Sequence, residues 1–163
     1  MSSQIFTDFS IYFNGPFICS NYLYCDFNMI VYGKLSKKYL AAIDCFATAL
    51  LSPQLKSHIT VTIKFNRKLP VFGFTEIDGY NSKGKPREFI LELKSNQTEK
   101  ELLKTLAHEM VHVKQYAYGE IDERGTKWLS RKMDHDSVPY HKRPWEKEAF
   151  KMEDKLYKEF TGE

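Results

Sequence analysis

Residues Thr98 to Gly119 read TEKELLKTLAHEMVHVKQYAYG, and this stretch predicts the best-defined element of the chain. Thr98 and Glu101 have the spacing of a capping box, in which each side chain accepts a hydrogen bond from the other residue's backbone amide. Gly119 is a residue type that commonly ends a helix. Apolar residues recur at helical spacing between these two signals, namely Leu102, Leu103, Leu106, Met110 and Val113. We therefore predict an amphipathic helix over about 98–119.

The middle of this predicted helix carries the sequence His108-Glu-Met-Val-His112. Residues four apart are neighbours on one face of a helix, so His108 and His112 can direct their imidazoles at one point. Neutral imidazole is a good ligand for zinc, and Glu109 stands beside such a metal rather than on it. We predict a Zn²⁺ site with His108 and His112 as ligands and Glu109 as the catalytic general base.

A catalytic zinc site usually has three protein ligands, so a third is expected downstream. The possible ligands are Asp122, Glu123, Asp134, His135, Asp136, His141, Glu146 and Glu148. We favour Glu148, because it lies near the start of a last predicted helix and the small Ala149 would let that helix approach closely. Glu146 lies two residues away, on nearly the opposite side of the same helix. Glu146, His135 and His141 stay open as alternatives.

The remaining pattern predicts an α+β fold in a single domain over 1–163. Ser36 can cap a helix over about 37–51, and alternating apolar residues predict strands over 59–65, 71–77 and 88–94. We expect these strands to form a small, mostly antiparallel meander packed against the helix over 98–119. Pro144 suits the first turn of the last helix. The aromatic residues 1–33 are expected to form two short strands or an N-terminal arm.

Composition narrows the possible classes of protein. A formal net charge of +3 neither requires nor excludes a nucleic-acid partner. The three cysteines show no C-x-x-C pair, which favours reduced thiols. The start of the chain lacks the basic region of a secretory signal. The apolar run over 18–32 is too short and too polar for a membrane span. We expect a cytoplasmic protein.

The block from Leu93 to Phe150 resembles the SprT-like and gluzincin-type zinc peptidases (zincins), and in particular small HExxH proteins often encoded by phages. The residues that carry the resemblance are His108-Glu-Met-Val-His112, the tail Gln115 to Gly119, Trp128, and Pro144 to Ala149. The resemblance covers about a third of the chain. In the SprT family the third ligand is a His shortly after the HExxH helix, whereas the comparable stretch here, Glu123 to Trp128, has none. A Glu followed by Ala is how several gluzincin-like families present that ligand.

The resemblance and the motif together imply a zinc metallopeptidase that acts on a protein or peptide substrate. Glu109 would take a proton from the attacking water and pass it to the leaving amine. Tyr140 or His141 would stabilise the developing oxyanion. The strand over 88–94 would bind the substrate backbone by strand addition.

Two other functions stay open. One is a metal-dependent amidase or endopeptidase that acts on peptidoglycan, for which the chain shows no wall-binding segment. The other is a non-catalytic binding protein on a zincin scaffold, against which the intact Glu109 argues. A weak association with nucleic acid, through basic residues between 127 and 143, also stays open. The sequence does not indicate the oligomeric state.

Overall fold

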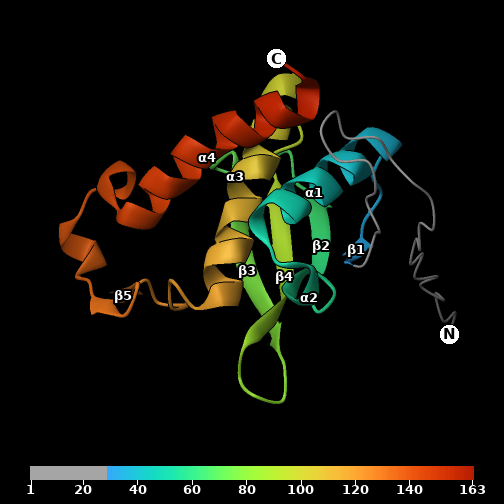
Figure 1. Cartoon of the computed structure of the whole chain (residues 1–163). Helices are drawn as coiled ribbons and strands as arrows, with labels where there is room; N and C mark the ends of the chain where they lie inside the picture. Colours follow the sequence, from blue (N-terminus) through green and yellow to red (C-terminus); the bar gives the residue numbers. More distant parts are fainter. Residues whose placement is uncertain (1–28) are drawn as a thin grey trace, which may run out of the picture.

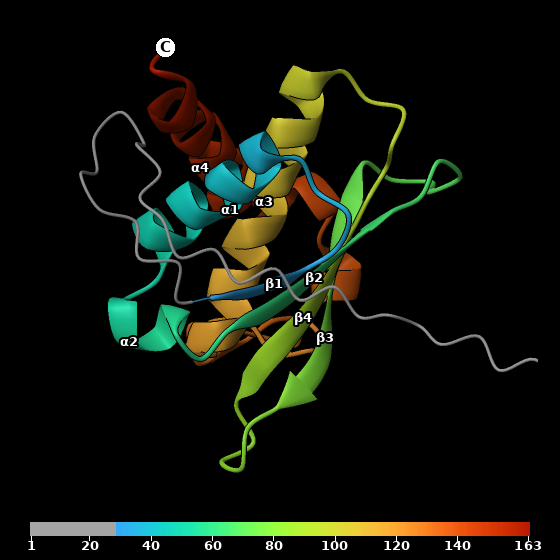
Figure 2. The same cartoon turned by 90° about the vertical axis from the view of Figure 1, so that its right-hand side faces the viewer.

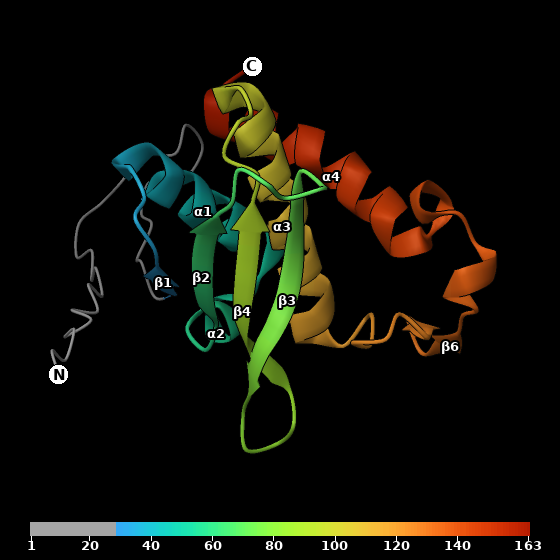
Figure 3. The same ribbon diagram turned by 180° about the vertical axis from the view of Figure 1, so that it is seen from behind.

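A computed structural model describes residues 29–163, apart from the side chain of His135, and shows an α+β fold. The predicted N-terminal arm lies mostly outside the described residues, and only β1 (Ile30–Tyr32) represents it. Three further strands complete the main sheet, β2 (Thr60–Phe65), β3 (Gly73–Tyr80) and β4 (Pro86–Leu93). Their order is β1-β2-β4-β3, as Figure 3 shows from the open face of the sheet.

The sheet is mixed, and the prediction of a mostly antiparallel meander was wrong. β1 pairs parallel with β2, and β2 pairs parallel with β4, while β3 and β4 form the antiparallel pair. β4 therefore lies between β2 and β3, although it follows both in sequence. The burial of the strands explains this order, because Phe89, Leu91 and Leu93 of β4 are all buried whereas β3 alternates between partly buried and exposed residues.

Helices cover one face of this sheet (Figures 1 and 2). They are α1 (Lys37–Leu50), the short α2 (Pro53–Lys56), α3 (Glu99–Tyr118) and α4 (Pro144–Thr161). α3 lies against β3 and β4, and α1 and α4 both contact it. The apolar stripe predicted for α3 faces the core, where Leu103, Leu106 and Met110 are almost completely buried. α3 is thus held between the sheet and α4.

The segment between α3 and α4 extends to the side of the sheet (Figure 1). It contains the two-stranded hairpin of β5 (Lys127–Trp128) and β6 (Arg131–Lys132), followed by the 3₁₀ turns η1 (His135–Ser137) and η2 (Tyr140–Lys142). The rings of Trp128 and Trp145 lie 6.3 Å apart and join this hairpin to the start of α4. The segment thereby returns the chain to α3, with the first turn of α4 next to the histidines.

Candidate metal centre

Three residues of the site come from consecutive turns of α3. The predicted helix signals are confirmed, since Thr98 and Glu101 form the capping box and Gly119 ends the helix in the left-handed conformation. His108, Glu109 and His112 are all buried. The imidazole rings of His108 and His112 lie edge to face with their centres 4.9 Å apart. Both rings therefore reach the same space between α3 and α4, as the spacing of four residues predicts.

Glu146, from the first turn of α4, completes a group that could hold a metal ion. Its Oε2 atom lies 3.3 Å from Nε2 of His108 and 3.5 Å from Nε2 of His112. One potential ligand atom from each of the three side chains falls within 4.8 Å of the others. The carboxylate of Glu146 is itself 5% exposed, so the three donors form an enclosed cluster.

The structure brings Glu146 to the histidines in place of the predicted Glu148. Two residues rotate a helix by about 200°, so the two carboxylates leave α4 on nearly opposite sides. Glu148 instead accepts hydrogen bonds from Lys114 and Gln115 of α3, at 3.0 and 2.8 Å. The alternative ligand His141 is exposed on η2 and is not part of the group. The alternative His135 has a side chain outside the described part of the structure.

A second layer of side chains fixes the orientation of both imidazoles. Nδ1 of His108 donates to Oε2 of Glu153 at 2.8 Å, and Nδ1 of His112 donates to Oε1 of Gln115 at 2.8 Å. The amide nitrogen of Gln115 in turn donates to Glu148. With both Nδ1 atoms engaged as donors, a neutral imidazole carries its lone pair on Nε2, the atom that faces Glu146 and that a metal would use. In the metal-free protein a protonated imidazole instead donates from Nε2 to the carboxylate of Glu146.

In the metal-free protein, the three side chains of the group strongly shift one another's pKa values. Burial alone would lower the pKa of His108, but the carboxylates of Glu146 and Glu153 outweigh it and raise this pKa to about 9. Burial would raise the pKa of Glu146, but its hydrogen bonds with His108 and His112 lower it to about 2. A buried cluster of this kind favours positive charge at its centre, carried by protons or by a metal ion.

Glu109 lies beside this group and is held by the edge strand β3. The hydroxyl of Thr75 lies 2.8 Å from Oε2 of Glu109 and can donate to it. Burial raises the pKa of the Glu109 carboxyl, against the opposing effect of the two histidines. A Cβ atom at Gly73 would lie 3.0 Å from Oε1 of Glu109 and 2.7 Å from Cγ2 of Thr105, so a glycine is needed for this close approach.

Two tyrosines also interact with the group. Tyr140, the predicted oxyanion donor, is half exposed on η2, and burial together with the nearby carboxylate of Glu146 raises its pKa. Tyr116 follows His112 by one turn of α3. Burial and the negative charges of Glu146 and Glu109 raise the pKa of Tyr116 to about 12. Both hydroxyls therefore stay protonated near neutral pH and can donate hydrogen bonds.

A pocket of about 690 Å³ opens beside these residues, and its lining includes His108, Glu109 and Tyr140. The first residues of β3 border it as well. β3 is at the edge of the main sheet, whereas β4 is paired on both sides. The prediction that the strand over 88–94 accepts a substrate strand was therefore wrong, because β4 has no free edge.

Sequence reasoning missed Thr75, Gln115, Tyr116 and Glu153. Periodicity offered a signal for three of them. Gln115 and Tyr116 continue the His108–His112 face of α3, and Glu153 lies seven residues after Glu146 on one face of α4. No local signal pointed to Thr75, because its role depends on how β3 docks against α3.

Comparison with known proteins finds no protein-family model, no curated protein and no solved structure that matches the chain. Within residues 29–163, no helix is both long enough and apolar enough to cross a membrane.

Proposed function

We propose that the protein is a zinc-dependent metallopeptidase with a zincin-like active site, in which His108, His112 and Glu146 hold the metal and Glu109 is the general base. The observation that carries this proposal is the convergence of the three buried donors next to a buried glutamate at the border of a pocket. Glu109 has no role as a ligand in this arrangement. Its place beside the group is the one that a general base requires.

The two distances from Glu146 to the histidines are close to those of a zinc site. Four ligands in a tetrahedron with bonds of about 2.0–2.1 Å have ligand atoms about 3.3–3.4 Å apart. The Oε2 atom of Glu146 lies at 3.3 and 3.5 Å from the two Nε2 atoms. Two imidazoles and one carboxylate also form one of the ligand sets of catalytic zinc, with the fourth position left to water. Bound zinc would lower the pKa of that water to about 7 and polarise the substrate carbonyl.

The residues of the chain would then act as follows. Glu109 accepts the proton of the attacking water and delivers it to the departing amine. Thr75 keeps the carboxylate of Glu109 in place. Tyr140 can donate a hydrogen bond to the carbonyl oxygen as negative charge develops there. No strand of residues 29–163 pairs with the outer edge of β3, which offers backbone groups along which an extended peptide can pair.

The first test is the metal content of purified protein, measured by elemental analysis. We expect about one zinc per chain in the wild type and in Glu109→Gln, and loss of zinc in His112→Ala and Glu146→Ala. Glu148→Ala, on the same helix, removes only an outer partner and should retain more zinc than Glu146→Ala. A wild type that binds no supplied zinc would contradict the proposal and favour a non-catalytic binding protein.

The second test is peptide-bond cleavage by the zinc-loaded protein, with an unfolded protein as substrate and mass spectrometry of the products. Glu109→Gln should abolish cleavage while retaining zinc, since the amide cannot accept the proton. Purified peptidoglycan is the parallel substrate. Cleavage of peptidoglycan without cleavage of unfolded protein would favour the amidase alternative.

A further inference from the structure

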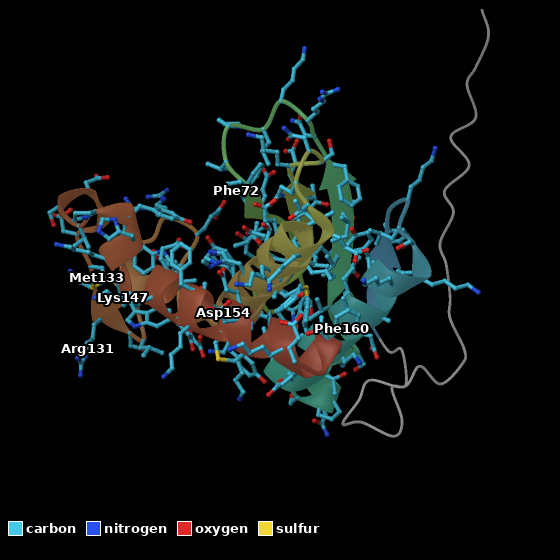
Figure 4. The ribbon with its side chains drawn as sticks, turned by 90° about the horizontal axis from the view of Figure 1, so that it is seen from above. Phe72, Arg131, Met133, Lys147, Asp154 and Phe160 are labelled. Carbon is cyan, nitrogen blue, oxygen red and sulfur yellow. The ribbon has the colours of Figure 1, made fainter. Side chains whose placement is uncertain are left out.

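Apolar side chains from two elements face each other across the pocket beside the candidate metal centre. Phe72 and Val71, on the loop before β3, are 65% and 49% exposed, and Phe150 of α4 is 43% exposed. All three line the same pocket, together with His108 and Glu109. Phe72 lies across the pocket from α4, whose course Lys147 and Asp154 mark in Figure 4. We call this the apolar pocket. Exposed apolar side chains that gather in one place mark a binding surface.

The apolar pocket is continuous with the candidate metal centre. The ring of Phe150 lies edge-on to the imidazole of His108, with 4.7 Å between their centres. Gly73, directly after Phe72, approaches Glu109 so closely that a Cβ there would lie 3.0 Å from its carboxylate. A group bound in the apolar pocket is therefore next to the reacting atoms, so it must belong to a substrate residue close to the cleaved bond.

The wall that carries Phe72 is held in place by hydrogen bonds. The carbonyl of Phe72 accepts from the backbone amide of Lys94 at 2.8 Å and from the side-chain amide of Gln97 at 3.1 Å. The side-chain oxygen of Gln97, Oε1, accepts from the hydroxyl of Thr105 on α3 at 2.8 Å. The loop is thus tied to both β4 and α3. A pocket whose wall is already ordered binds its ligand with less loss of entropy.

Most polar groups in the lining already have partners within the protein. Glu101 is bound by the cap residue Thr98, Lys104 by Asp154, and Glu153 by His108. A polar side chain that entered the pocket would lose water without gaining these groups as partners. The ammonium group of Lys94 also lines the pocket, and no partner for it is shown within residues 29–163. An acidic side chain is therefore the competing occupant.

We propose that the apolar pocket binds a large apolar side chain of the peptide substrate, aromatic or long aliphatic, adjacent to the cleaved bond. This inference rests on the proposed function, because it places that side chain relative to a carbonyl at the metal. The volume of about 690 Å³ is large enough for such a side chain and is typical of pockets that hold small molecules. Apolar walls on both sides favour an apolar occupant through the surface that it buries.

The test uses four peptide hydroxamates on one scaffold, which differ only in a single residue: Phe, Leu, Asp or Gly. The hydroxamate chelates zinc, and the variable residue reports on the pocket. Binding to the zinc-loaded wild type is measured by calorimetry. The Phe and Leu compounds should bind at least about tenfold more tightly than the Gly and Asp compounds, as expected for burial of a large apolar side chain.

Variants of the wall separate the pocket from the metal. Phe72→Ser should remove most of the preference for the Phe compound and leave the affinity of the Gly compound unchanged. The matched control is Phe65→Ser at the end of β2, a partly exposed phenylalanine, 39% accessible, that does not line the pocket. This control should behave as the wild type does. Zinc content is measured for each variant.

The outcomes distinguish this proposal from the proposed function. If zinc is bound and all four compounds bind equally, or the Asp compound binds most tightly, the apolar pocket proposal is overturned and the metallopeptidase proposal is unaffected. If the Gly compound shows no binding that depends on zinc, the proposed function fails and the pocket proposal fails with it. Loss of the preference in Phe65→Ser as well as in Phe72→Ser would also overturn the pocket proposal.

Discussion

Glu109 is buried, and the hydroxyl of Thr75 on the neighbouring strand can hydrogen-bond its carboxylate at 2.8 Å. Thr75→Val keeps the shape of the side chain and removes this donor. We expect kcat to fall roughly tenfold or more with KM and zinc content unchanged, because partners of this kind orient catalytic groups. Thr75→Ser should retain most of the activity. Steady-state kinetics on an unfolded-protein substrate measures this, and an unchanged kcat in Thr75→Val would contradict it.

Glu146 and Glu148 act in different layers of the site, so their substitutions should weaken zinc binding to different degrees. Glu148 accepts from Gln115, which orients His112, whereas Glu146 lies next to both histidines. Glu148→Gln should weaken zinc binding by up to about 10–100-fold, the usual effect of an outer partner. Glu146→Gln should weaken it much more. A competition titration with a zinc chelator measures both, and equal losses would contradict the assignment.

These two residues also show where prediction from the sequence reached its limit. His108, Glu109 and His112 could be placed together because their spacing falls within one helix. The choice between Glu146 and Glu148 depends on how α4 is rotated about its own axis against α3. That rotation is set by buried residues such as Trp145, Ala149 and Leu156. The sequence shows that these residues form one apolar face of the helix, but it does not show which element that face packs against.

At the scale of elements, the helices and strands could be predicted but their pairing could not. The capping box at Thr98, the stop at Gly119 and Pro144 at the start of α4 are local signals, and the structure confirms them. The alternation of apolar and polar residues along a strand indicates which side chains face the core, but it does not indicate which other strand pairs with it. The insertion of β4 between β2 and β3 is favoured by its larger buried side chains, Phe89, Leu91 and Leu93.

A buried ion pair joins α1 to α2 and supports a prediction about stability. Nζ of Lys56 lies 2.5 Å from Oδ1 of Asp44, and both side chains are less than 10% exposed. Among the described residues, Oδ2 of Asp44 has no hydrogen-bond partner. Lys56→Ala should destabilise the protein by about 3–5 kcal/mol, because it leaves a buried carboxylate without a cation. The double variant Asp44→Leu/Lys56→Met should lose much less.

Urea unfolding of the wild type and of both variants measures this difference in stability. The double variant serves as the control for packing, because it restores apolar volume at both positions. If Lys56→Ala unfolds at the wild-type urea concentration, the ion pair contributes little and the prediction is wrong.

At the scale of the whole molecule, the candidate metal centre joins parts of the chain that are far apart in sequence. β3 supplies Thr75, α3 supplies both histidines, and α4 supplies Glu146 after the long segment that contains β5 and β6. Metal binding would therefore link the sheet, the central helix and the last helix. Because such a site is fully assembled only in the folded chain, the free energy of metal binding should add to the stability of the fold.

The charges of the centre predict how that stability changes with pH. The pKa of His108 is raised from 6.5 to about 9 in the folded, metal-free protein. The resulting stabilisation is present below pH 6.5 and is lost as the pH rises through about 9. It amounts to about 3 kcal/mol at most. Zinc needs neutral imidazoles, so the stabilisation by zinc should grow over the same interval as proton competition falls.

Thermal unfolding of metal-free and zinc-loaded protein between pH 6 and 9 tests this prediction. The Tm of the metal-free protein should fall by roughly 5–10 °C more than that of the zinc-loaded protein, given about 2–4 °C per kcal/mol for a domain of this size. The control is His108→Gln/His112→Gln, which should remove both the extra fall and the effect of zinc. A gap between the two Tm values that stays constant or narrows toward pH 9 would show that protons do not occupy the centre in the absence of metal.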